Sequence, residues 1–352
     1  MKKVFSILLV VIILMIVLNS CFGEDQTTTV TLPTNTSPVI TKPTHPTTTT
    51  TTINQESPVD PPVDNEYSEG LEYTLNDDGK SYSVTGIGIC TDTDIVIPSI
   101  YEGSPVTSIG TSAFAYGNSI TSVKIPYSVT SIDSSFILSQ ALKSIEVDVN
   151  NQHYVSIDGN LYSKDLKTLI QYAIAKEATS FTIPDFVISI GVGAFYGCTS
   201  LTKIIIPDSV TSIGMGALMW CKSLTSIEVD VNNQCYQSIA GNLYTKDGKT
   251  LVQYAIGKED TLFTIPNFVT NIYFGAFSLC YSLTSIVIPN SVTSIGANVF
   301  PYCLSLTSIN YDGSVDQWGA INKGDYWDYN TQTYTIYCTN GEISKDGTVT
   351  YK

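Results

Sequence analysis

The chain has 352 residues and a formal net charge of −15, from 32 acidic and 17 basic side chains. Every basic residue is a lysine, and the chain contains no arginine. Proteins that bind DNA or RNA rely on basic patches and on the guanidinium group to hold phosphate, so this composition argues against a nucleic-acid partner. Only two histidines are present, which leaves almost no material for a histidine-centred triad or a multi-histidine metal site. We expect no cofactor.

The N-terminus has the three parts of a secretory signal. Two lysines precede an apolar run from Val4 to Leu18, and Asn19 and Ser20 separate that run from Cys21. Residues 18–21, Leu-Asn-Ser-Cys, resemble the lipobox of bacterial lipoproteins, in which the cysteine becomes the first mature residue and carries the lipid. We therefore predict a signal peptide over residues 1–20 and lipidation of Cys21. The alternative is an uncleaved membrane anchor, for which the apolar run is slightly short.

Residues 21–66 are rich in threonine and proline and include six consecutive threonines at 47–52. Such a segment has too few large apolar residues to offset the entropy of folding, and each proline removes a backbone donor. In the polyproline conformation about 40 residues reach on the order of 100 Å. We predict a disordered spacer that holds the following domain away from a membrane.

Past residue 65 the sequence repeats itself. A Ser-Ile-Gly-like segment is followed after four or five residues by a Phe or Leu, and these Phe or Leu positions are 22 or 23 and then 59 residues apart. Residues 144–193 and 226–275 are identical at 36 of 50 aligned positions, which indicates a recent duplication. The recurring pairs are Ile109 with Phe114, Ile132 with Phe136, Ile190 with Phe195, Ile213 with Leu218, Ile272 with Phe277 and Ile295 with Phe300.

Residues 283–296 show the pattern of one short unit. The segment Leu-x-x-Ile-x-Ile places apolar residues on one face of a strand, and the proline that follows ends that strand. A second extended piece ends at Ser-Ile-Gly, and segments such as Ala-Phe-Tyr-Gly-Cys fit a brief helical or 3-10 return. One turn of about 23 residues cannot bury its apolar face alone, so the units must stack into a β-rich solenoid of the leucine-rich-repeat type.

The motifs Leu-x-x-Ile-x-Ile-Pro, Ser-Val-Thr-Ser-Ile-Gly and Ala-Phe-x-x-Cys-x-Ser-Leu recur in register from about Tyr73 to Cys338. They resemble the BspA-type leucine-rich repeats of bacterial surface proteins. The sequence departs from that pattern at Leu218, where the aromatic residue is aliphatic, and at Gly117 and Ser139, where smaller side chains replace the cysteine. The resemblance implies a repeat coil on the bacterial cell surface.

The two ends of a solenoid need caps, because an open end exposes a strand edge and an apolar cross-section. We assign the repeats to residues 106–310, a β-rich N-terminal cap to 67–105 and a C-terminal cap to 311–352. In the first cap, alternating residues around the turn at 76–79 predict a hairpin. In the second, Trp318 and Trp327 either seal the core or form a carbohydrate-stacking patch.

Seven cysteines follow Cys21, and four of them share one repeat position, which predicts an inward-facing ladder. Adjacent turns lie about 5 Å apart, a separation that allows disulfides between neighbours, but cysteine is also a common small core residue. The four cysteines are therefore either buried free thiols or disulfide partners, and both alternatives remain. A metal site is the least favoured reading, because no Cys-x-x-Cys motif or neighbouring histidine is present. The four residues are Cys198, Cys221, Cys280 and Cys303.

The duplicated segments at 148–151 and 230–233, Asp-Val-Asn-Asn, carry oxygen ligands suited to calcium, but their spacing differs from that of a calcium loop and fits a turn better. Glu146 and Glu228 recur at equivalent positions and suggest the carboxylate pair of a glycosidase. They belong to successive repeats of 81 to 82 residues, which we call long units, and this places them too far apart for that chemistry. No other catalytic motif is visible in the sequence, and we expect no enzymatic activity.

A repetitive surface without catalytic residues is best explained as a binding surface. Two rows of strand residues should point away from the core, and their chemistry varies while the frame stays fixed, although neutral drift gives the same picture. We expect a lipid-anchored cell-surface protein that binds an extracellular protein or other surface ligand. The alternative is an envelope scaffold that self-associates or tethers wall polysaccharide. The candidate binding residues are Lys124, Glu146, Lys203, Ile205, Glu228, Val287 and Asn310.

Overall fold

The computed structural model describes residues 67–115, 117, 119–133, 136 and 139–352. The predicted signal peptide, Cys21 and the spacer lie outside these residues. Within the described part of the chain, no helix combines the length and the apolar character needed to cross a bilayer.

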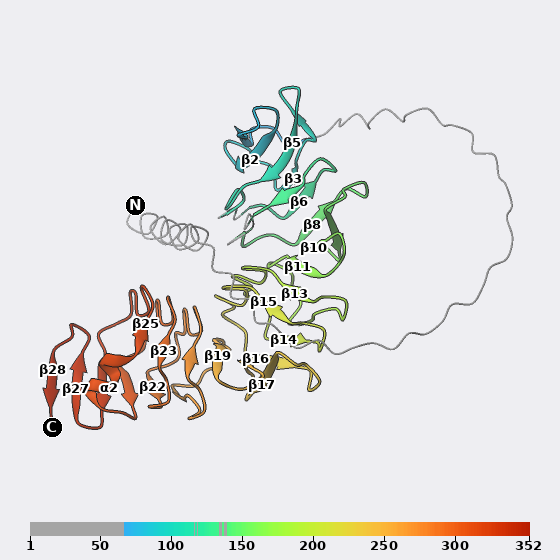
Figure 1. Cartoon of the computed structure of the whole chain (residues 1–352). Helices are drawn as coiled ribbons and strands as arrows, with labels where there is room; N and C mark the ends of the chain where they lie inside the picture. The colour runs from blue at the N-terminus through green and yellow to red at the C-terminus, as the bar shows by residue number, and fades with distance from the viewer. Residues whose placement is uncertain (1–66, 116, 118, 134–135, 137–138) are drawn as a thin grey trace, which may run out of the picture. The chain divides into compact units, whose positions relative to one another are not determined.

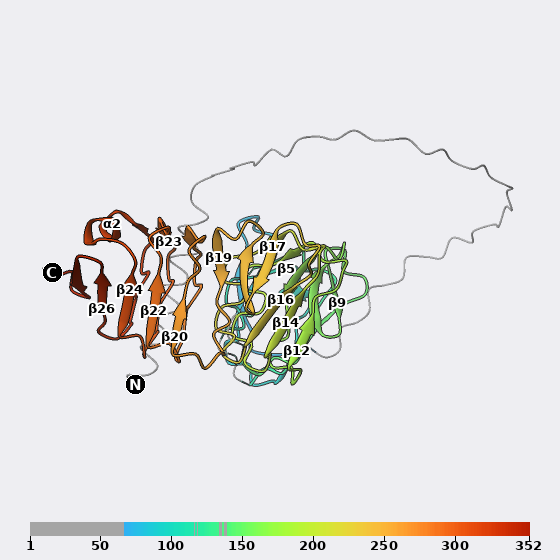
Figure 2. The ribbon, with the colours of Figure 1, turned by 90° about the horizontal axis from the view of Figure 1, so that it is seen from below.

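The described chain coils into stacked turns, and this confirms the predicted leucine-rich-repeat solenoid. Each turn gives one strand to a parallel ladder, which we call the front ladder (Figures 1 and 2). In β14, Ile204 and Ile206 are buried while Lys203 and Ile205 are partly exposed, as the alternation of a strand requires. The front strands are β3 (Asp94–Val96), β6 (Ser122–Ile125), β8 (Ser144–Val147), β12 (Ser180–Thr182), β14 (Lys203–Ile206), β16 (Ser226–Val229), β20 (Leu262–Thr264), β22 (Ser285–Ile288), β24 (Ser308–Tyr311) and β26 (Thr335–Cys338).

A second ladder, the side ladder, is built mostly from the Ser-Ile-Gly-like segments, with β11 and β19 following the hairpins. Its first member β5 pairs antiparallel with the short strand β4 (Ile100–Tyr101). The chain then returns through tight turns in which the Cys198 N–H donates to the Phe195 carbonyl at 3.0 Å, an i to i−3 bond of the 3-10 kind. The side strands are β5 (Ser104–Ile109), β7 (Ser131–Ile132), β11 (Thr168–Gln171), β13 (Ser189–Ile190), β15 (Ser212–Ile213), β19 (Thr250–Gln253), β21 (Asn271–Ile272), β23 (Ser294–Ile295) and β25 (Asn322–Lys323).

A β-hairpin interrupts both ladders once in each long unit. The two copies are β9 (Tyr154–Ile157) with β10 (Asn160–Ser163), and β17 (Tyr236–Ile239) with β18 (Asn242–Thr245). On the front side, the Ile145 N–H of β8 donates to the Gly159 carbonyl at 2.8 Å, and Ile227 of β16 makes the same bond to Gly241. Each hairpin therefore covers a strand edge that would otherwise be open to pairing with another chain.

The two hairpins turn on residues with left-handed backbone. Asp158 and Gly159 have φ of 49° and 70°, and Ala240 and Gly241 have 49° and 75°. Positive φ at both central residues is the requirement of a type I′ turn, which suits Asp-Gly and disfavours alanine. The second copy therefore holds its hairpin with a strained residue that the first copy avoids.

Replacing Ala240 with aspartate, the residue of the first copy, should raise the free energy of unfolding by up to about 1 kcal/mol. Urea denaturation followed by circular dichroism measures the change. A variant that is no more stable than the parent would show that the turn at 240–241 carries no strain.

The two ends of the repeat region differ in construction (Figure 1). At the N-terminal end, β1 (Glu72–Leu75) and β2 (Tyr82–Gly86) form the predicted antiparallel hairpin, and β2 pairs with β5. At the C-terminal end, β26 continues into the antiparallel strands β27 (Gly341–Ser344) and β28 (Val349–Tyr351), beside the short helix α2 (Val315–Ala320). Trp318 is buried and Trp327 packs against the same cluster, as the core-sealing interpretation expects.

Aromatic side chains stack along the interior. Ring centroids of Phe277 and Phe300 lie 5.1 Å apart, and those of Phe114 and Phe136 lie 5.6 Å apart. Leu218 occupies the same position in its turn and is also buried, so the aliphatic departure fills the core without a ring. Stacked aromatic pairs add to the free energy of burial, so these positions anchor the solenoid.

Candidate functional site

The outward positions of the front ladder form a polar and varied surface, which we call the front face. Glu228 and Lys124 are exposed, and Lys203, Ile205, Val287 and Asn310 are partly exposed. The predicted residues that share a sheet stand next to one another in register: Lys124 opposite Glu146, Ile205 opposite Glu228, and Val287 opposite Asn310.

The front face contains further rungs that the sequence analysis missed. The turn at the start of each long unit has no preceding Leu-x-x-Ile motif, because Ala178 and Asp260 stand where most of the other turns have leucine. The proline after Ile183 and Ile265 was the available signal, since it follows the other front strands. In the described residues, the unpredicted outward positions level with the candidate row are Val96, Thr182, Thr264 and Tyr337.

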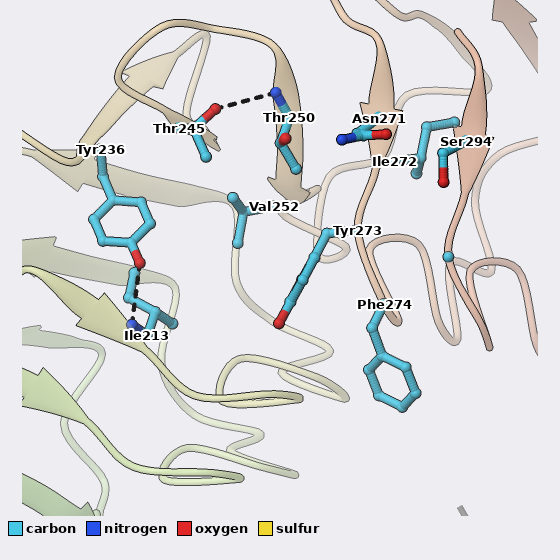
Figure 3. Close-up of a pocket in the computed structure, with 11 residues that line it drawn as sticks. Ile213, Tyr236, Thr245, Thr250, Val252, Asn271, Ile272, Tyr273, Phe274 and Ser294 are labelled. Atoms are coloured by element: carbon cyan, nitrogen blue, oxygen red, sulfur yellow. Dashed lines mark hydrogen bonds between the residues drawn. The ribbon is translucent and has the colours of Figure 1, made fainter. Parts of the chain in front are cut away.

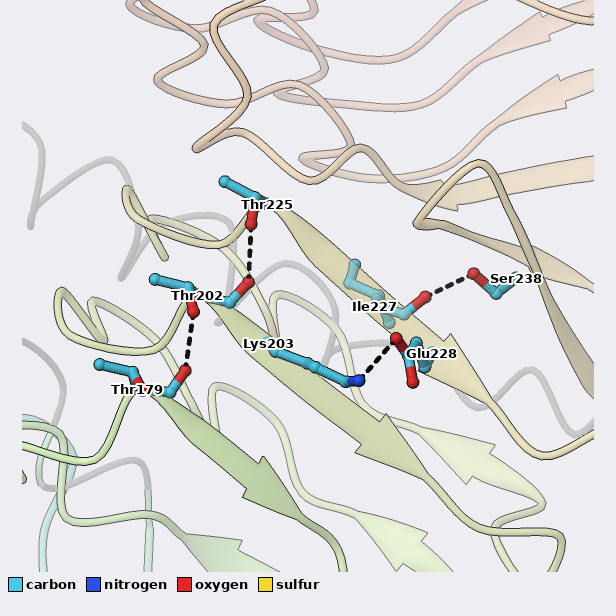
Figure 4. A network of polar contacts seen from close by, with 7 residues as sticks. All are labelled: Thr179, Thr202, Lys203, Thr225, Ile227, Glu228 and Ser238. Carbon is cyan, nitrogen blue, oxygen red and sulfur yellow. Dashed lines mark hydrogen bonds and ion pairs between the residues drawn. The ribbon is translucent and has the colours of Figure 1, made fainter.

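The front face is divided into separate sheets. The three sheets are β3-β6-β8, β12-β14-β16 and the sheet that starts at β20. The hairpins cause the division, because the Gly159 and Gly241 carbonyls accept N–H groups of β8 and β16 that would otherwise pair with the next front strand. The Ser238 hydroxyl also donates to the Ile227 carbonyl of β16 at 2.5 Å, which further satisfies this strand edge (Figure 4).

Charge on the front face is locally compensated. Lys203 Nζ lies 2.7 Å from Glu228 Oε1 across β14 and β16 (Figure 4). At the first rung, the hydroxyls of Ser122 and Thr121 donate to Asp94 at 2.7 and 2.8 Å, and these bonds lower the pKa of its carboxyl. The last sheet instead exposes Leu262 and Tyr337. Charged, polar and apolar side chains therefore all occur on the front face.

Threonines at the starts of the front strands form a ladder of their own (Figure 4). Thr202 Oγ1 donates to the Thr179 carbonyl at 3.0 Å, and Thr225 Oγ1 donates to the Thr202 carbonyl at 3.1 Å. Each hydroxyl proton is thus used by the preceding turn. These threonines link successive turns by hydrogen bonds. A ligand could use their hydroxyl oxygens only as hydrogen-bond acceptors.

The four cysteines of the shared position point into the core and are free thiols in the structure. The Cys221 thiol donates to the Phe195 carbonyl at 3.2 Å, and the Cys303 thiol donates to the Phe277 carbonyl at 3.1 Å. Burial raises the pKa of Cys280 to about 12. A neutral, enclosed thiol of this kind is a packing residue and a poor nucleophile.

The duplicated Asp-Val-Asn-Asn segments are turns. Asp148 Oδ1 accepts the Asn150 N–H at 2.8 Å, and the amide of buried Asn151 bonds to four backbone groups of the turn and of the neighbouring coil. No group of three acidic, histidine or cysteine side chains in the described residues could hold a metal ion. Glu146 and Glu228 lie in different sheets, β8 and β16.

Comparisons with known proteins agree with this architecture. A model of the BspA-type leucine-rich repeat region matches residues 90–167, 171–247 and 258–322, with six copies of the repeat. No curated protein matches the chain.

Three solved structures of leucine-rich repeat or surface proteins are similar to the chain. A leucine-rich cell surface protein from Faecalibacterium prausnitzii is 25% identical over 73% of this chain and 97% of its own, with a TM-score of 0.37. A leucine-rich repeat protein from Eubacterium ventriosum is 25% identical over 70% of this chain and 71% of its own, with a TM-score of 0.42. The pneumococcal vaccine antigen PcpA is 17% identical over 76% and 87%, with a TM-score of 0.40. Because the family model covers more than half of its residues, the chain belongs to the BspA-type leucine-rich repeat family.

Proposed function

We propose that this protein is a non-enzymatic binding protein held on the outside of a bacterial cell by a lipid on Cys21, and that its front face binds an extracellular protein or surface ligand. The observation that carries the proposal is the front face itself, where varied outward residues stand at fixed strand spacing. Membership of the BspA-type family supports a place on the cell surface. The mixture of charged, polar and apolar outward residues suits an extended protein partner, whose chemistry can change along its length.

The face can be tested with a pair of substitutions on separate sheets. The double variant Ile205→Lys, Val287→Lys should bind matrix or plasma proteins at least about tenfold more weakly, because each lysine removes an apolar contact and adds a desolvated charge. Binding of the purified protein to a panel of such proteins is measured by surface plasmon resonance. The control is Val231→Lys, in the turn that follows β16, where the side chain is 84% exposed and off the front strands.

Equal binding by the double variant and the control would contradict a role for the front face. If the parent protein binds no member of the panel, no host cell and no other bacterium, yet assembles in solution, the scaffold function replaces adhesion. Analytical ultracentrifugation of the same samples reports that assembly.

The anchor has its own test. Cys21→Ala removes the thiol to which lipid would be attached, so the variant should fail to incorporate labelled fatty acid and should be released from the membrane or remain unprocessed. Cys90→Ala, at a partly exposed cysteine within the folded region, is the control and should be lipidated normally. Unchanged membrane attachment and labelling of the Cys21 variant would contradict the lipoprotein proposal.

A further inference from the structure

A pocket of about 470 Å³ lies on the side ladder where the second hairpin interrupts it (Figure 3). The side sheet that ends at β15 stops here, and the next begins with β17 and β18. Residues of β15, the hairpin, β19, β21 and β23 line the space, and Phe274 follows β21. The lining residues that matter below are Tyr236, Tyr273, Phe274, Asn271, Thr250 and Ser294.

The hairpin fixes one wall of this pocket. The Ile213 N–H at the edge of β15 donates to the Tyr236 hydroxyl at 3.1 Å, so the Tyr236 ring is held at a defined position (Figure 3). The first copy makes the same bond, from the Ile132 N–H to Tyr154 at 3.0 Å. The frame of the pocket is therefore a repeated element of the fold.

What distinguishes the second copy is the pair Tyr273 and Phe274. The equivalent residues of the first copy are Gly191 and Val192, and Asn271 is equivalent to Ser189. Within two otherwise closely matching segments, these changes add two aromatic residues and an amide to the lining of the pocket. In the second copy, aromatic rings and polar side chains therefore line the same pocket.

Tyr273 occupies a position that is glycine at 191, 214 and 296. A Cβ atom on Gly214 would lie 2.5 Å from the Val192 nitrogen, and one on Gly296 would lie 2.8 Å from the Phe274 nitrogen. On Gly191, which follows a hairpin as Tyr273 does, the nearest atom would be 3.1 Å away. The hairpin leaves the following turn more room, and in the second copy a tyrosine fills it.

The chemistry of the lining selects a class of ligand. The residues that line the pocket include no lysine, aspartate, glutamate or histidine. Aromatic faces beside hydroxyl and amide groups match a sugar ring, which presents C–H bonds on its faces and hydroxyls around its edge. The volume lies within the range of small-ligand sites, about 300–1,000 Å³. We propose that this pocket binds a neutral saccharide of one or two rings. The site is distinct from the front face and does not depend on the function proposed for it.

The first copy supplies the test variant. The triple substitution Asn271→Ser, Tyr273→Gly, Phe274→Val converts the pocket to a sequence that this fold already accommodates at 189–192. The parent protein is titrated with maltose, lactose, cellobiose and N,N′-diacetylchitobiose, and binding is followed by saturation-transfer-difference NMR and calorimetry. At least one of these disaccharides should bind, and the triple variant should bind it at least about tenfold more weakly with an unchanged unfolding midpoint.

Two further measurements make the result specific. Glucuronic acid tests the role of charge and should bind more weakly than the neutral sugars, because a carboxylate entering an uncharged pocket loses hydration without gaining a partner. The front-face variant Ile205→Lys, Val287→Lys should bind the sugar as the parent does. The proposal is overturned if none of the four disaccharides binds at millimolar concentration, if the triple variant binds equally well, or if a peptide of residues 27–62 occupies the pocket instead.

Discussion

Replacing Asn233 with alanine should lower the free energy of unfolding by about 3 kcal/mol. Its side chain is fully buried and bonds to four backbone groups. The Nδ2 amide donates to the carbonyls of Pro207 and Val210 in the preceding turn at 2.8 and 2.9 Å, and Oδ1 accepts the N–H groups of Cys235 and Tyr236, both at 2.8 Å. Alanine would remove all four of these bonds and would loosen the start of the hairpin.

The measurement is urea denaturation followed by circular dichroism. The matched control is Asn232→Ala, one residue earlier, where the side chain is exposed and the backbone bond to Asp230 is retained; a change within about 0.5 kcal/mol is expected. Equal effects at the two asparagines would contradict the structural role assigned to Asn233. A calcium-dependent midpoint in the parent protein would contradict the assignment of this segment as a turn.

The substitution Phe277→Ala should cost about 3–5 kcal/mol, as truncation of a buried aromatic residue usually does. The Phe277 ring is fully buried and lies 5.2 Å from that of Tyr254, 5.8 Å from that of Phe263 and 5.1 Å from that of Phe300. Its loss opens a cavity between turns on both sides. Because solenoid stability is the sum of turns and their interfaces, two interfaces weaken at once.

Phe268→Ala is the control for this prediction, since its ring is 46% exposed and lies edge-on to the Tyr244 ring at a centroid distance of 6.5 Å. Its expected cost is about 1 kcal/mol. Differential scanning calorimetry of both variants gives the comparison. A smaller loss for Phe277→Ala than for Phe268→Ala would show that the aromatic stack does not anchor the core.

The repeat period and the alternation of Ile with polar residues were sufficient to predict the coil, because both the strand and the inward face depend on local pattern. The cysteine ladder followed in the same way from a shared position. In each case, the identity of the buried residue and its spacing determine where the side chain lies. The sheet topology was harder to predict, because it depends on which backbone groups an inserted segment satisfies.

The hairpins and their pairing were not predicted from the sequence. Asp158-Gly159 between two short alternating runs is a strong local signal for a two-residue turn, and it was available in the sequence. Its duplicate reads Ala240-Gly241, which hides the signal. Pairing of each hairpin with β11 or β19, and closure of the β8 and β16 edges, are long-range events that no local pattern specifies. The pocket at Tyr273 depends on the same events.

The closed hairpin edges have a consequence for how such a chain can change. At each hairpin, the turn glycine accepts a hydrogen bond from the front strand just before it in the chain. Glu146 and Glu228 lie at equivalent points of two long units, 82 positions apart. Unequal recombination between the two near-identical segments would remove or add one whole unit and rejoin equivalent residues. The reach of the protein and the number of surfaces it presents can therefore vary in single steps, while the two terminal structures stay the same.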